Sequence, residues 1–165
     1  MNTLRAGAAL VLLAGLGACA PAAAPGPQAP PGAQLRLASS GIAVAGTGRE
    51  IGFGRTEAST LDTLRDILGP YVPPRPAPAC AGVETVRWED EGLALHFDRS
   101  GFIGWEALPA AQPVSTLGGL RAGGPAPGDA SLVPFERNGI QGLSGPEGEI
   151  ARLWAGRDCP TPGTS

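Results

Sequence analysis

Several common residue types are scarce in this chain of 165 residues. It contains no lysine, so all twelve basic residues are arginine, and it has one histidine, one methionine and three cysteines. The formal net charge is −3 and the arginines form no run, which argues against a nucleic acid or an anionic lipid surface as the partner. The lack of lysine, together with 26 glycines and 18 prolines, indicates the coding bias of a GC-rich genome rather than a function.

Long apolar runs are also missing. One apolar run without a charge lies near the N-terminus. This run, Ala6–Leu16, follows Arg5. At about 1.5 Å per helical residue it covers roughly half of the hydrocarbon core of a bilayer, so it is too short for a transmembrane helix. The layout is typical of an export signal, which we predict over residues 1–18.

The residues that end this run resemble the lipobox of bacterial lipoproteins. They read Leu16-Gly17-Ala18-Cys19. In that family the cysteine receives diacylglycerol, becomes the new N-terminus and is usually acylated again, for example with palmitate. The resemblance implies lipidation of Cys19 and a protein anchored to the bacterial envelope. It favours the periplasmic side of the outer membrane over the inner membrane as the place of the anchor. The alternative is an ordinary signal peptide in which Cys19 is an incidental small residue.

A proline-rich tract separates this cysteine from the rest of the chain. Residues 19–33 have prolines at positions 21, 25, 27, 30 and 31 among alanines and glycines, and they carry no charge. Such a segment cannot bury enough apolar surface to fold, and at ~3.1 Å per residue in polyproline II geometry it reaches roughly 40 Å. We therefore predict a spacer between the membrane and a single globular domain over residues 34–159, with a tail over residues 160–165.

The odd number of cysteines requires an explanation in an exported protein. Lipidation of Cys19 leaves Cys80 and Cys159, and an oxidising compartment favours a disulfide between them. The alternative is a pair of free, reactive or metal-binding thiols.

The pattern of apolar residues predicts an α+β fold that is mostly β. Leu61, Leu64, Ile67 and Leu68 recur at helical spacing, with Thr56 or Ser59 as the cap and Gly69-Pro70 as the stop. This single amphipathic helix needs one face of a sheet to cover. Short strands are expected over 35–38 and 42–44, and residues 71–79 are expected to form an extended loop.

Alternating residues then predict an antiparallel meander over 83–88, 93–97 and 102–105. A shift of 47 residues places Trp88 on Phe135, Gly92 on Gly139 and Ile103 on Ile150. We interpret this as a degenerate tandem repeat, with a first unit over 34–108 that contains the helix and a second unit over 113–159 without one. Chance alignment of turn glycines is the alternative.

Three segments in the first unit carry a resemblance to a known family. They are "IGFGRT" (residues 51–56), "LGP" (68–70) and "WEDEGLALHF" (88–97). Their order is similar to the small bacterial lipoproteins of the SmpA/OmlA type and to the related β-lactamase-inhibitor-protein-like repeats. The resemblance implies a helical segment packed on a three- or four-stranded antiparallel sheet, and the binding of proteins or envelope components without catalysis.

Catalytic motifs find little support in the sequence. His96 is expected on the solvated face of its strand, and "GLSGP" (residues 142–146) lacks the spacing of a nucleophile elbow. Glu89, Asp90 and Glu91 are expected to form a solvated turn rather than a calcium site. We therefore expect no catalytic residue, no bound metal and no cofactor.

The few aromatic residues leave the function open between two classes. Most are expected in the core, but an exposed tryptophan would be the leading contact residue, and Trp105 with its neighbour Glu106 is the predicted contact. The first class is a membrane-anchored envelope lipoprotein with a non-catalytic role in protein binding or assembly. The alternative is a secreted inhibitor or ligand-binding module that acts on an envelope hydrolase.

Overall fold

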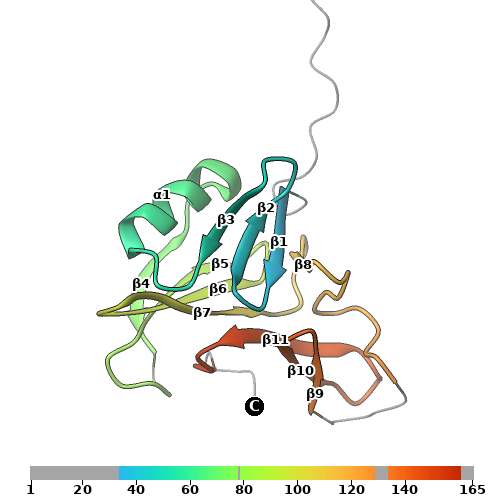
Figure 1. The fold of residues 1–165 in the computed structure, drawn as a ribbon. Helices are drawn as coiled ribbons and strands as arrows, with labels where there is room; N and C mark the ends of the chain where they lie inside the picture. The colour runs from blue at the N-terminus through green and yellow to red at the C-terminus, as the bar shows by residue number, and fades with distance from the viewer. Residues whose placement is uncertain (1–33, 78, 129–133, 161–165) are drawn as a thin grey trace, which may run out of the picture.

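The computed structural model describes residues 34–77, 79–128 and 134–160 (Figure 1). The predicted signal peptide, Cys19, the spacer and residues 161–165 lie outside the described residues. The mostly β fold with one helix is confirmed. A four-stranded sheet has the order β3-β2-β1-β8, and a seven-stranded sheet has the order β4-β5-β6-β7-β11-β10-β9. The elements are β1 (Leu35–Ala38), β2 (Gly41–Val44), β3 (Arg49–Gly52), α1 (Glu57–Leu68), β4 (Val72–Pro76), β5 (Glu84–Trp88), β6 (Leu93–Asp98), β7 (Gly101–Ala107), β8 (Ser115–Thr116), β9 (Pro134–Arg137), β10 (Ile140–Ser144) and β11 (Ile150–Gly156).

The main core lies between the large sheet and the layer formed by α1 and the small sheet. In Figure 1 both α1 and strands β1–β3 lie above β5–β7. Trp105 on β7 is fully buried, and its Nε1 donates a hydrogen bond of 2.8 Å to the main-chain oxygen of Ala38 at the end of β1. The core consists of side chains from every layer, among them Leu35, Leu37, Ile42, Ile51, Leu64, Leu93, Leu95, Phe97, Phe102, Ile150 and Leu153.

Helix α1 forms where the apolar spacing predicts it. Leu61, Leu64 and Leu68 are buried against the sheets. Neither predicted hydroxyl caps the helix through a side-chain hydrogen bond. Thr56 occupies the N-cap position but makes no such bond, and Ser59 lies inside the helix, where its Oγ accepts a hydrogen bond from Arg55 Nε. The helix ends as expected at Gly69, whose φ of 84° is a left-handed value that glycine adopts without strain.

The segment expected to be an extended loop after the helix contains a strand. β4 pairs antiparallel with β5 and forms one edge of the large sheet. Its prolines at 73, 74 and 76 have no main-chain N–H, which restricts proline to positions that do not donate to a neighbouring strand. The same feature protects this edge from pairing with another chain.

Two meanders form most of the large sheet. The order β5-β6-β7 is followed by β11-β10-β9, because β7 and β11 pair antiparallel with Trp105 opposite Ala155. The strands of the second meander therefore extend the sheet in the reverse of their order in the chain. A shift of 47 residues places the start of β6 on the start of β10, and the described part of residues 113–159 contains no helix. Both observations agree with the two predicted units, although the duplication itself stays a prediction.

None of the helices in the described ranges has the length and apolar character needed to cross a membrane.

Candidate functional site

Polar side chains are buried on the face of the large sheet that points away from the core. Successive side chains of a strand alternate between faces, so Glu106 lies opposite to its neighbour Trp105. His96 on β6 lies on the same outer face, because Leu95 is the residue that pairs with Trp105. Glu106 has 0% exposure, and His96 has 1%. This outer face is therefore covered, and not open to solvent as the alternation predicted.

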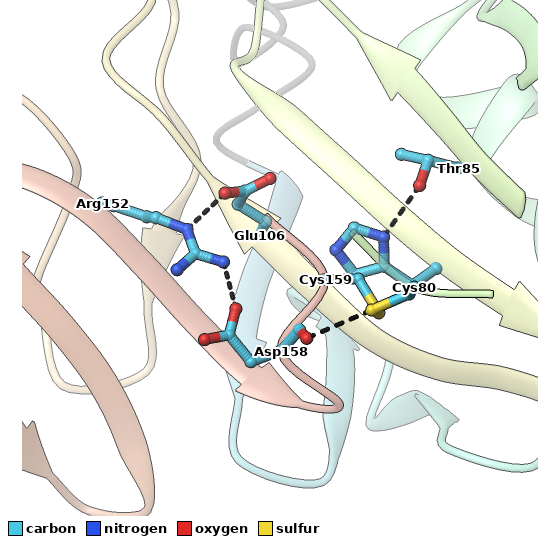
Figure 2. Close-up of polar contacts among 7 residues, drawn as sticks. Cys80, Thr85, Glu106, Arg152, Asp158 and Cys159 are labelled. Carbon is cyan, nitrogen blue, oxygen red and sulfur yellow. Dashed lines mark hydrogen bonds and ion pairs between the residues drawn. A yellow bond between two sulfur atoms is a disulfide. The ribbon is translucent and has the colours of Figure 1, made fainter. Parts of the chain in front are cut away.

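A short C-terminal segment supplies the cover. After β11, residues 157–160 fold back over the outer face, and we call them the C-terminal strap. Arg152 pairs through Nε with the Glu106 carboxylate and through its Nη2 with Asp158 of the strap (Figure 2). Its guanidinium also lies 4.3 Å from the centre of the Trp154 ring. One arginine thus joins β7, β11 and the strap.

The pairing decides the charge state of Arg152. Burial lowers the pKa of this guanidinium. The hydrogen bonds and negative charges of Asp158 and Glu106 raise it by more than burial lowers it, so the net pKa is above its usual value. A buried carboxylate and a buried guanidinium are costly to desolvate separately, and each compensates for the other here.

His96 stays neutral beneath the strap. Its Nδ1 lies 3.0 Å from Thr85 Oγ1, and its buried Nε2 has no hydrogen-bond partner among the described residues. Burial, the largest cause, and the positive charge of Arg152 together lower the pKa of His96 to about 4, although the negative charge of Asp158 opposes both. The expectation of a solvated histidine is wrong, because alternation along β6 cannot indicate that a distant segment covers the second face.

The predicted disulfide is present and fastens the strap. Cys80, in the loop between β4 and β5, is bonded to Cys159, with their Cα atoms 5.7 Å apart and 79 residues of sequence separation. Cys159 is fully buried, whereas Cys80 is partly buried, and Cys80 Sγ lies 3.4 Å from the main-chain oxygen of Asp158. The bond is surrounded by a second, small apolar cluster of Ala77, Val83, Ile103 and the two cysteines.

An open pocket lies beside this disulfide. Its volume is about 440 Å³, and Cys80 forms part of its wall. The other lining residues include Pro76, Val83 and Phe97 together with the charged Glu57, Glu84, Asp98 and Arg99. Of the two bonded residues, only the partly buried Cys80 therefore borders this pocket.

A groove of about 320 Å³ lies at another part of the surface, where three turns meet. The β1–β2 turn contributes Ser39 and Ser40, the β9–β10 turn contributes Asn138, and the segment after β8 contributes Leu117. Leu117 is 65% exposed and is the one exposed large apolar side chain of the described residues. A lone leucine in a glycine-rich turn has no periodic signal, so the sequence could not single it out.

The predicted contact pair is not available to a partner. Trp105 and Glu106 both have 0% exposure, so the prediction that they form a surface contact is wrong. The strand that contains them is central in the large sheet, where one face packs on the core and Arg152, paired with Asp158 of the strap, lies against Glu106 on the other. Glu91 is likewise only 6% exposed, and burial raises its pKa despite a main-chain hydrogen bond, with Asp90 raising it further.

The described residues contain no group of three histidine, cysteine, aspartate or glutamate side chains that could hold a metal ion. Comparisons with protein-family models, with curated proteins and with solved structures found no match for this chain.

Proposed function

We propose that this chain is a lipid-anchored protein of the bacterial envelope whose folded domain binds a protein partner without catalysis. The observation that carries the proposal is the position of Cys19, between an uncharged apolar run and a proline-rich spacer. β1 begins at Leu35, directly after that spacer, and Leu35 is fully buried. A tether attached there would pull on the core of the domain rather than on a loose end.

The groove at Leu117 supports the binding role. Residues of the β1–β2 turn line it, so it lies at the end of β1 remote from Leu35 (Figure 1). A partner seated there would lie away from the anchor. Arg137 in the groove wall makes no ion pair within the described part of the chain, and it can pair with a carboxylate of the partner beside the apolar contact at Leu117.

The only histidine supports a role without catalysis. A general base must reach the proton that it removes, and it works best with a pKa close to the operating pH. His96 is 1% exposed beneath the strap and has a pKa of about 4.

Mass spectrometry of the processed protein tests the anchor. We expect an N-terminal Cys19 that carries diacylglycerol, and we expect a Cys19→Ala variant to lack the mass of that lipid. An unmodified N-terminus in the natural chain would refute the proposal.

Site-specific crosslinking tests the binding role. A photo-crosslinking residue at position 117 should attach to one envelope protein, whereas the same residue at the exposed helix position 62 should not. Leu117→Asp in the presence of a crosslinker at position 118 should abolish that product. If the captured protein is an envelope hydrolase whose activity the domain blocks, the role is that of an inhibitor. Equal, nonspecific products at positions 117 and 62 would exclude the groove.

A further inference from the structure

The two sulfurs of the disulfide differ in accessibility. Cys159 is fully buried in the small apolar cluster, and Cys80 lies in the wall of the open pocket of about 440 Å³. A thiolate attacks a disulfide at the sulfur that it can approach, and the other sulfur leaves. The pocket therefore directs attack to Cys80.

Within the part of the chain that the structure describes, the strap has few other polar attachments. Arg157 N donates a bond of 2.9 Å to the main-chain oxygen of Ile103, and Asp158 pairs with Arg152. The pair between Arg157 and Asp98 is 3.5 Å long and lies at the surface, where ion pairs contribute little. The disulfide is thus the one covalent restraint that keeps this short segment on the outer face.

We propose that Cys80 is a site of thiol–disulfide exchange, at which an external dithiol opens the disulfide and frees the C-terminal strap from the outer face of the sheet. This inference does not depend on lipidation of Cys19 or on the groove at Leu117. It means that the redox state of the disulfide controls which residues of the outer face are exposed.

The exchange proceeds in two steps. A thiolate of the dithiol bonds to Cys80 Sγ, the Cys80–Cys159 bond breaks, and Cys159 leaves as a thiolate that takes a proton from solvent. The second thiolate of the dithiol then attacks the dithiol sulfur that is bonded to Cys80 Sγ. The bond between that sulfur and Cys80 breaks, and Cys80 leaves as a thiolate that is protonated in the same way. The protein gains two electrons and two protons, and the dithiol becomes a disulfide.

Release of the strap changes what the outer face presents. Asp158 moves away from Arg152, and the ring of His96 becomes accessible to water. Thr85, Glu106 and Arg152 stay on β5, β7 and β11 and face the same region. The opened form therefore presents a histidine, a carboxylate and a guanidinium that the closed form covers.

The first experiment tests the site of attack. The full chain with Cys19→Ser, in its disulfide form, is treated briefly with 2-mercaptoethanol, quenched in acid, alkylated and mapped by mass spectrometry. We expect the mixed disulfide on Cys80 and the alkylated thiol on Cys159, with a preference of at least tenfold. The same treatment in urea should give both products in similar amounts. A native chain modified mainly on Cys159, or equally on both, would overturn the proposal.

The second experiment tests release of the strap. The NMR titration of His96 in the same chain should give a pKa near 4 before reduction, and dithiothreitol, an uncharged dithiol suited to the acidic pocket wall, should raise it toward 6.5. The indole N–H signal of Trp105, bonded to Ala38, should persist and report a folded core. A Cys80→Ser/Cys159→Ser variant should match the reduced chain without reductant.

In this second experiment, either of two outcomes would overturn the proposal. If the pKa of His96 stays near 4 after reduction, the strap remains in place. If the Trp105 signal is lost, the disulfide holds the whole domain together and its opening is no local switch.

Discussion

At the scale of single residues, the buried His96 makes stability depend on pH. Its pKa is about 4 in the folded chain and about 6.5 when unfolded, so the unfolded chain binds the proton more tightly. The stabilisation is complete above pH 6.5 and is lost as the pH falls toward 4, by roughly 3 kcal/mol. Urea unfolding at several pH values should show this loss, and His96→Gln should flatten it. Equal pH dependence in both chains would mean that His96 is not buried.

The ion pair under the strap gives a second expectation at this scale. Arg152→Met deprives the fully buried Glu106 carboxylate of its cation and should lower the free energy of unfolding by about 3–5 kcal/mol. The matched control is Arg65→Met, which breaks the exposed pair with Asp62 at 2.9 Å and should cost less than about 1 kcal/mol. Similar losses in the two variants would contradict the difference in burial. Urea unfolding at pH 7 measures both.

Individual residues were predictable where chemistry alone decides, and not where a distant segment decides. The Cys80–Cys159 pair follows from the expected export of the chain and the count of thiols. The burial of His96 on β6 and Glu106 on β7 does not follow, because alternation along each strand cannot indicate a cover that comes from the far end of the chain. The exposure of Leu117 has no sequence signal.

At the scale of elements, the helix and the meander strands followed from apolar periodicity. The spacing of Leu61, Leu64 and Leu68 fixes the buried face of α1 whatever lies opposite. β4 was missed because three of its residues are prolines, which are rare in strands except at an edge. Only the pairing with β5, a tertiary fact, shows that the segment is that edge.

The turn glycines of the two meanders differ in what surrounds them. Gly101 and Gly148, equivalent under the shift of 47 residues, have φ values of 108° and 79°. A Cβ on Gly101 would lie 2.4 Å from the main-chain oxygen of Arg55, whereas a Cβ on Gly148 meets nothing within 4 Å. Gly148→Ala should therefore cost only about 1–2 kcal/mol of backbone strain, and Gly101→Ala roughly 2–5 kcal/mol. Thermal unfolding of the two variants measures the difference, and equal losses would show that β7 is not held against Arg55.

At the scale of the whole molecule, the joining of the meanders was beyond sequence reasoning. Antiparallel pairing of β7 with β11 joins the two meanders in one seven-stranded sheet. Each meander has its own alternation, which is satisfied equally well in two separate sheets. The pairing instead depends on β7 and β11 sharing the core on one face and the Glu106–Arg152 pair on the other.

The disulfide acts on this whole assembly through the unfolded chain. It closes a loop of 79 residues of sequence separation, and the chain-entropy estimate for such a loop is about 4.5 kcal/mol. Cys80→Ser/Cys159→Ser should therefore lower the free energy of unfolding by up to that amount, while the domain stays folded in water on its main core. Urea unfolding of this variant and of the natural pair, both with Cys19→Ser, measures the loss. A loss below about 1 kcal/mol would mean that the unfolded chain is already compact, and a chain unfolded without urea would mean that the main core is insufficient by itself.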